Sequence, residues 1–231
     1  MENINLSNSG GISRRDFIKN LAIGGSAIAI FSNFGFYHLS EDEEGVIRAI
    51  IVDYDKCTGC RTCEAVCSAF NHRQIVNGET LLGSGNPFLS NIRVQHFNPD
   101  VDIPAVCAMC PDAPCIEACP VPADPETGRK ALYRDGKIFT IKNDPERCTG
   151  CGKCAEACKA QGVGVIIPNS KTNKPERICT LCNGDPQCVK YCPFGALSYV
   201  EVDTKRELYG MSPVNIAKEL NKRFYNIQER R

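Results

Sequence analysis

The chain has 231 residues, enough for one or two domains, and its 27 basic and 27 acidic side chains exclude the strongly basic surface of a nucleic-acid-binding protein. It contains no tryptophan but sixteen cysteines, a cysteine content well above ordinary usage. Something other than a large apolar core must therefore hold much of the fold together.

Residues 1–40 have the features of a twin-arginine export signal. Residues 13–19 read SRRDFIK, and a moderately apolar stretch, residues 21–36, follows them. This stretch is short for a membrane span and suits the apolar region of a signal, although an amphipathic or buried N-terminal helix is the alternative. No small-residue cleavage site closes it, so cleavage and retention as a membrane anchor both stay open. We expect a folded protein exported to the periplasm, because the twin-arginine route carries proteins that are already folded.

Short strands are expected around the first cysteines. The acidic run 41–44 joins the signal to a domain, and the β-branched stretch Gly45–Asp53 predicts a strand. The 39 residues Ser68–Val106 form the longest insertion between cysteine groups. Within it, Gly83–Pro87 predicts a loop and Asn91–Phe97 predicts a strand.

The second half of the chain predicts a hairpin, a strand and a terminal helix. Ala131–Ile141 has two short apolar runs around Asp135-Gly136, which is a hairpin signal, and Gly195–Val202 predicts a strand. In the tail, Ser212-Pro213 predicts a helix start. One helical face then carries Ala217, Leu220, Phe224 and Ile227. This apolar face is expected to pack on the same protein or on a partner.

The sixteen cysteines fall into four groups of four. The groups are Cys57, Cys60, Cys63, Cys67; Cys107, Cys110, Cys115, Cys119; Cys148, Cys151, Cys154, Cys158; and Cys179, Cys182, Cys188, Cys192. Disulfides need no quartets, and structural zinc usually takes two CxxC pairs with a longer spacer. The CxxCxxCxxxC run is instead that of bacterial ferredoxins. The pattern therefore favours four 4Fe-4S clusters over zinc or disulfides.

The third group, CTGCGKCAEACK, indicates that one group serves two clusters. Gly150 and Gly152 ease the approach of the backbone to one cubane. The helical rise then places Cys158 roughly 6 Å along the axis from Cys154, which suits a second cluster. In two-cluster ferredoxins the fourth cysteine of this run ligates the other cluster. The groups must therefore work in pairs, but their spacing does not decide between neighbouring and nested pairs.

An internal repeat organises the chain. The first and third groups share CTGCxxCxxxC, whereas the second and fourth share CxxC, a gap of four or five residues, and CxxxCP. Two kinds of half-site, each used twice, predict two ferredoxin-like modules. The fold class expected is α+β, with short strands, hairpins and short helices around four 4Fe-4S clusters.

The stretch from about Gly45 to Val202 resembles the four-cluster ferredoxin-type electron-transfer subunits of molybdenum and tungsten enzymes. These include the small subunits of dimethyl sulfoxide reductase, polysulfide reductase and formate dehydrogenase. The resemblance rests on the four ordered groups, the endings Cys119-Pro120 and Cys192-Pro193, and the hairpin before the third group. We expect a signal at 1–40, a four-cluster domain at 41–205 and a helical tail at 206–231.

The resemblance also implies nested pairing of the cysteine groups. The outer module takes the groups 57–67 and 179–192, and the inner module takes 107–119 and 148–158. The implied ligand sets are site 1, Cys57, Cys60, Cys63 and Cys192; site 2, Cys107, Cys110, Cys115 and Cys158; site 3, Cys148, Cys151, Cys154 and Cys119; and site 4, Cys179, Cys182, Cys188 and Cys67.

The resemblance further implies a non-catalytic electron-transfer subunit. It would connect a large molybdenum- or tungsten-pterin subunit with a membrane quinone-reactive or cytochrome subunit. The gap Asn183–Gln187 is shorter than is usual in the dimethyl sulfoxide reductase group, and is more similar to small subunits that accompany aldehyde:ferredoxin oxidoreductase-type enzymes. An aldehyde oxidoreductase-type partner is therefore favoured; a dimethyl sulfoxide reductase, polysulfide reductase or formate dehydrogenase-type complex is the alternative.

Two other classes of function fit the sequence less well. An enzyme in its own right lacks a catalytic constellation, because His38, His72 and His96 are scattered and no nucleophile motif or phosphate loop is present. A free-standing exported ferredoxin would need neither the long insertion nor the tail helix. We interpret the basic residues near the cysteines as solvated surface charge; they are Lys56, Arg147, Lys153 and Lys190.

Overall fold

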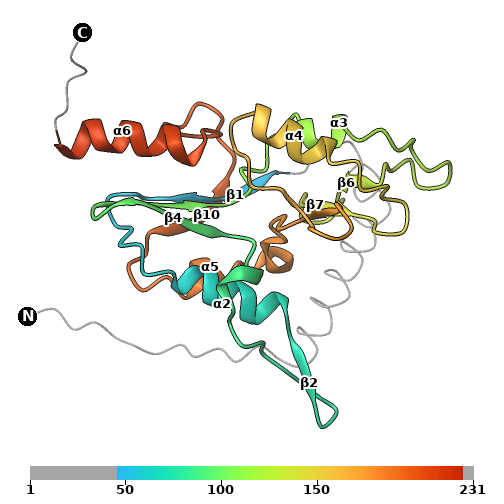
Figure 1. Ribbon diagram of the computed structural model, residues 1–231, viewed down its shortest axis with the longest axis horizontal. Coiled ribbons are helices and arrows are strands. Elements are labelled where there is room, and N and C mark those ends of the chain that lie inside the picture. Colours follow the sequence, from blue (N-terminus) through green and yellow to red (C-terminus); the bar gives the residue numbers. More distant parts are fainter. Residues whose placement is uncertain (1–45, 226–231) are drawn as a thin grey trace, which may run out of the picture. The chain divides into compact units, whose positions relative to one another are not determined.

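The computed structural model describes residues 46–225, which form an α+β structure of short strands and few helices (Figure 1). The predictions for residues 1–40, for the acidic run 41–44 and for Ile227 lie outside the described residues. Residues 46–225 lie in one compact unit, so the tail helix lies in the same unit as all sixteen cysteines. Within residues 46–225, no helix is long and apolar enough to cross a membrane.

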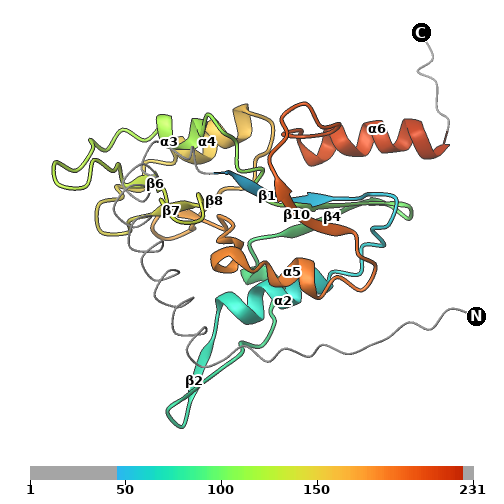
Figure 2. The same cartoon turned by 180° about the vertical axis from the view of Figure 1, so that it is seen from behind.

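The first and last strands pair with each other. Strand β1 (Arg48–Val52) runs antiparallel to β10 (Leu197–Glu201), with Ile50 opposite Tyr199. Both predicted strands are confirmed, and they lie side by side in Figures 1 and 2 although the whole cysteine-rich region separates them in sequence. This pairing therefore brings the two outer cysteine groups toward each other.

The long insertion contains more structure than was predicted. The expected strand is confirmed as β4 (Arg93–Asn98), which pairs with β5 (Val101–Ala105), and a short 3-10 helix η1 (Pro87–Leu89) precedes it. The hairpin of β2 (Gln74–Val76) and β3 (Glu79–Leu81) was missed. Its turn is Asn77-Gly78, both with positive φ, and Asn-Gly is a strong hairpin signal that the sequence displays plainly.

The hairpin before the third cysteine group is present, but its second strand lies later than predicted. Strands β6 (Leu132–Arg134) and β7 (Ile141–Asn143) pair, so β7 begins where the predicted strand ended. The cause is Asp135, whose carboxylate accepts hydrogen bonds from the backbone N–H groups of Lys137 and Ile138 at 2.8 and 3.0 Å. These bonds stabilise a wider loop than a two-residue turn. A last pair joins β8 (Ile167–Pro168) and β9 (Pro175–Glu176).

The helices pair in a nested order. Helix α2 (Thr62–Asn71) packs against α5 (Gln187–Lys190), and α3 (Pro114–Glu117) packs against α4 (Lys153–Ala160), as Figure 2 shows. A 3-10 helix, η2 (Leu181–Gly184), leads into α5. Each helix of a pair carries or borders cysteines of a different group. The first group therefore meets the fourth, and the second meets the third.

Sulfur replaces much of the usual apolar core. The main core contains Ile50, Ile92 and Leu181 together with buried thiols. The buried cysteines in it are Cys63, Cys67, Cys107, Cys115, Cys154, Cys158, Cys179 and Cys188. This composition explains how a chain without tryptophan closes a core around short helices.

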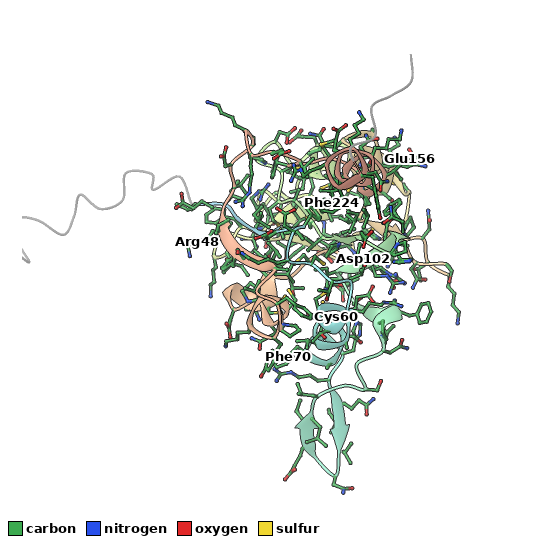
Figure 3. The ribbon with its side chains drawn as sticks, turned by 90° about the vertical axis from the view of Figure 1, so that its left-hand side faces the viewer. Arg48, Cys60, Phe70, Asp102, Glu156 and Phe224 are labelled. Carbon is green, nitrogen blue, oxygen red and sulfur yellow. The ribbon has the colours of Figure 1, made fainter. Side chains whose placement is uncertain are left out.

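The tail helix α6 (Pro213–Tyr225) packs on this protein, which is one of the two alternatives that the sequence left open. Ser212 caps it, because the Asn215 N–H donates to Ser212 Oγ at 3.2 Å. Ile216, Ala217 and Leu220 are buried in a second core, together with Val101 and Ile103 of β5. Phe224, at the far end of the helix, remains 37% exposed (Figure 3).

We predict that Leu220→Ala lowers the free energy of unfolding by about 2–5 kcal/mol, because it leaves a cavity where a side chain is 1% exposed. Thermal unfolding of the cluster-loaded protein measures the change, and the exposed Lys218→Ala is the matched control. Iron content should stay unchanged, since α6 carries no cysteine. A wild-type unfolding temperature for Leu220→Ala would contradict the packing described for α6.

Candidate metal centres

The structure gathers the cysteines into sulfur-lined cavities. All sixteen are free thiols, so disulfides do not account for them. Three cavities are each lined by four cysteines that come from two distant groups. Within residues 46–225, no three or more His, Cys, Asp or Glu side chains close around the position of a single metal ion.

The cavity at site 1 joins the two ends of the cysteine-rich region. It is lined by Cys57, Cys60, Cys63 and Cys192, with Val94, Pro104, Pro193, Phe194 and Leu197 among its apolar neighbours. The first three cysteines precede or begin α2, and the fourth follows α5. Four soft sulfur donors in an apolar surround suit an iron–sulfur cluster.

The cavities at sites 2 and 4 have the same construction. Cys107, Cys110, Cys115 and Cys158 line the first, beside Ile141, Val163, Ile166 and Ile178. Cys67, Cys179, Cys182 and Cys188 line the second, beside Ile50, Ile92, Val106 and Leu181. In each cavity, three thiols come from one group and the fourth comes from another.

At site 3 the structure brings together the trio from the third group. The thiols of Cys148 and Cys151 lie close enough to Cys154 to interact with it electrostatically. Cys119, the fourth member expected there, follows α3, and α3 packs against the helix α4 that contains Cys154.

The two CTGC loops share one backbone shape. Gly59 and Gly150 have φ of 65° and 68°, and a Cβ would lie 2.1 Å from Asp102 Oδ2 or 2.4 Å from the Thr172 carbonyl oxygen (Figure 3 shows Asp102 and Cys60). Gly152 differs, because a Cβ there would meet only Asn173 Nδ2 at 3.3 Å. Its counterpart Arg61 carries a full side chain at φ 62°. The close approach of the Thr172 carbonyl therefore requires glycine at position 150, whereas a Cβ at Gly152 would meet only a side-chain amide. That both glycines ease the approach of the backbone to a cubane stays a prediction.

Burial makes the thiols poor acids in the absence of iron. It raises the pKa of Cys63, Cys107 and Cys115 to about 12, and neighbouring negative groups add to the rise. Burial likewise raises the pKa of Cys154 to about 11. Iron ligation requires thiolates, so the positive charge of bound iron must offset this burial and release protons.

Backbone donors aim at several sulfurs. The N–H groups of Asn91, Leu181 and Ala196 donate to the sulfurs of Cys67, Cys179 and Cys192 at 3.3, 3.4 and 3.3 Å. At Cys60, burial raises the pKa, but hydrogen bonds from Thr62 and Thr58 outweigh it and hold the pKa below its ordinary value. Such donors stabilise thiolate charge and tune the potential of a bound cluster.

Electrostatic influence between thiols of different sites indicates which sites are neighbours. Burial raises the pKa of Cys188 most, and the neighbouring Cys63 raises it further, which links site 4 to site 1. In the same way, Cys107 raises the pKa of Cys179, which links site 4 to site 2. Cys154 raises the pKa of Cys115, which links site 2 to site 3. The row therefore runs from site 1 through sites 4 and 2 to site 3. Cys60 and Cys151, at its two ends, are the exposed cysteines.

Comparison with known proteins agrees with this chemistry. A family model described as a 4Fe-4S binding domain matches residues 140–166, which contain the third cysteine group. The putative electron transport protein YsaA of Escherichia coli is 35% identical over 160 residues, covering 68% of this chain and 91% of that protein. The chain belongs to the 4Fe-4S ferredoxin-type electron-transport proteins.

Other relatives of this ferredoxin-type protein are named as parts of oxidoreductases. The polyferredoxin-like subunit of aliphatic sulfonate oxidoreductase from Pyrococcus furiosus is 37% identical over 143 residues, 62% of this chain and 70% of that protein. A tetrathionate reductase subunit of Salmonella typhimurium is 26% identical over 199 residues, 80% of this chain and 72% of that protein. The prediction of an iron–sulfur electron carrier that is not catalytic on its own is confirmed.

The other polar residues singled out in the sequence lie at the surface of this ferredoxin-type protein. His72 Nε2 lies 2.8 Å from the Leu89 carbonyl oxygen, and His96 Nδ1 lies 2.9 Å from Asp102 Oδ1. Lys56 and Lys190 pair with nearby aspartates at 2.7 Å. Arg147 is more than solvated charge, because its guanidinium donates to the carbonyl oxygens of Arg129 and Pro122, each at 2.6 Å.

Sequence reasoning missed Glu64, the most deeply buried charged residue within 46–225. It is 0% exposed, accepts from Arg61 Nε at 2.6 Å, and also accepts from the Val94 N–H at 2.8 Å. The sequence signal was a carboxylate directly after a ligand cysteine, where the third group has Ala155. Glu64 ties the first cysteine loop to β4.

We predict that Gly150→Ala sharply lowers cluster occupancy at site 3, because the new Cβ overlaps a backbone carbonyl and the positive φ adds about 1–2 kcal/mol of strain. The measurement is iron and sulfide content after anaerobic purification, together with the visible absorption of the clusters.

Gly152→Ala is the matched control for this substitution, because Arg61 shows that a side chain fits the equivalent position. It should retain nearly all the iron of the wild type. Equal iron loss in the two variants would contradict the distinction drawn between the two glycines.

Proposed function

We propose that this chain binds four 4Fe-4S clusters and relays single electrons between a molybdenum- or tungsten-pterin catalytic subunit and a membrane quinone-reactive or other redox partner. The observation that carries the proposal is that sites 1, 2 and 4 each have four cysteines from two distant groups around one cavity. The proposed ligands are the four sets defined above, in an outer and an inner module.

A 4Fe-4S cluster, when bound, takes up and returns one electron without bond breaking. The protein contributes three things to this chemistry. Its cysteines hold neighbouring sites in the row 1, 4, 2, 3, apolar side chains exclude water from sites 2 and 4, and backbone N–H groups donate to sulfur. The exposure of Cys60 and Cys151 supports sites 1 and 3 as the two places where electrons enter and leave.

The names of the relatives support a catalytic partner for this chain. Subunits of aliphatic sulfonate oxidoreductase and of tetrathionate reductase are similar to it in sequence. The short gap Asn183–Gln187 favours an aldehyde oxidoreductase-type partner over a dimethyl sulfoxide reductase-type one. The export motif SRRDFIK supports a periplasmic, membrane-associated complex, because the twin-arginine route carries folded proteins.

We predict that the complex, purified anaerobically through this chain, is brown and contains about sixteen irons per copy of the chain, four for each cubane. It should also contain a large subunit with molybdenum or tungsten, which elemental analysis and mass spectrometry identify. A colourless, zinc-loaded protein would refute the cluster assignment. Recovery of an isolated, freely diffusing iron–sulfur monomer would instead favour a free-standing exported ferredoxin.

We predict that Cys192→Ser and Cys57→Ser perturb the same cluster, because the two thiols line one cavity. Redox titration followed by electron paramagnetic resonance should show one and the same signal altered in both variants. Cys148→Ser, the comparison variant, should alter a different signal. If Cys192→Ser instead altered the signal that Cys148→Ser alters, the nested pairing would be wrong.

A further inference from the structure

A cavity of a different character lies beside the cysteine sites. It has a volume of about 230 Å³, and its lining combines apolar residues such as Val165 and Ile167 with polar side chains from separate parts of the chain. These are Arg61, Arg93 and Arg177, together with Glu64, Asn91 and Gln95. No cysteine lines it, so it is distinct from the four sites described above.

Only one of the lining side chains is negative, and its bonding is already satisfied. Glu64 accepts from Arg61 Nε at 2.6 Å and from the Val94 N–H at 2.8 Å. The lining contains three guanidinium groups and one carboxylate, so it carries two more positive than negative charges. Glu64 also acts electrostatically on Arg93, but its single negative charge does not balance three guanidinium groups.

Donor capacity remains unused around the cavity. Among residues 46–225, Arg177 and the side-chain amides of Asn91 and Gln95 have no hydrogen-bond partner. Arg93 donates to the Pro87 carbonyl oxygen and lies over the Phe88 ring at 5.5 Å, which fixes its guanidinium without supplying a counter-charge. Burial lowers the pKa of Arg93, and the neighbouring charge of Arg177 lowers it further. The cavity thus concentrates positive charge that an anion would relieve.

We propose that this cavity binds a small tetrahedral oxyanion, of the size of phosphate or sulfate. Guanidinium groups present forked N–H donors that match oxyanion oxygens in pairs. Here they come from three separate segments of the chain: Arg61 lies just before α2, Arg93 lies in β4, and Arg177 lies just after β9. Donors from three elements suit oxygens arranged in three dimensions better than the two oxygens of a planar carboxylate.

The position of the cavity gives the bound anion an effect on electron transfer. Arg61 lies between Cys60 and Cys63 of site 1, and Arg177 lies two residues before Cys179 of site 4. A negative charge held there opposes the addition of an electron at these sites. Anion binding should therefore lower the reduction potentials of site 1 and site 4 relative to the anion-free protein.

The test uses the full chain with its clusters assembled, kept anaerobic and at constant ionic strength in chloride. Isothermal titration with sodium phosphate and with sodium sulfate should show saturable binding to the wild type. Arg177→Gln should weaken this binding at least about tenfold, since one forked charge is lost. The affinity of Arg177→Lys for the anion should lie between those of the wild type and Arg177→Gln. Arg73 is exposed and lies outside the cavity, so Arg73→Gln should bind the anion like the wild type.

Three results would overturn the proposal. They are no saturable binding of either anion, wild-type affinity in Arg177→Gln, or binding of acetate as tight as that of phosphate and sulfate. A redox titration provides a second readout, in which sulfate should lower two cluster potentials in the wild type and leave them unmoved in Arg177→Gln. Iron content is measured on every sample. A variant that has lost iron bears on the proposed electron-transfer function, whereas a variant that keeps its iron but no longer binds the anion bears on the anion site alone.

Discussion

The closure of each sulfur-lined cavity by thiols from two distant cysteine groups is the constraint on which the rest of the structure depends. The buried thiols occupy the place of an apolar core, yet burial raises the pKa of Cys63, Cys107 and Cys115 to about 12. Iron must supply the positive charge that makes thiolates stable in that environment. Folding and cluster binding are therefore coupled in this protein, as in other small metal-dependent folds.

The nested pairing of strands and helices follows from that constraint. Pairing of β1 with β10, and of α2 with α5, holds together groups that lie at opposite ends of the cysteine-rich region. Pairing of α3 with α4 does the same for the inner groups. The same arrangement stacks the sites in a row with Cys60 and Cys151 exposed at its ends, which is the geometry an electron relay needs.

Local patterns predicted the strands Gly45–Asp53 and Gly195–Val202 and the start of the tail helix, because periodicity and capping act over a few residues. The sequence predicted structure less well where a side chain bonds to backbone groups that its local pattern does not reveal. Asp135 widened a turn that its sequence suggested would be tight. Glu64 was missed because its burial depends on Val94, thirty positions away.

By itself the sequence determined the kind of centre, because CxxCxxC spacing shapes a local loop that only a few metal groups fit. It also indicated that each group shares a cysteine, since the offset of Cys158 along its helix suits a second cluster better than the first. Spacing left open which groups pair, and only the family resemblance implied the four ligand sets. The tertiary structure placed the thiols of sites 1, 2 and 4 around common cavities and gave the order of the sites. It alone brought Arg61, Arg93 and Arg177 around one cavity. Those relations are contacts between distant segments, and spacing along the chain carries no information about them.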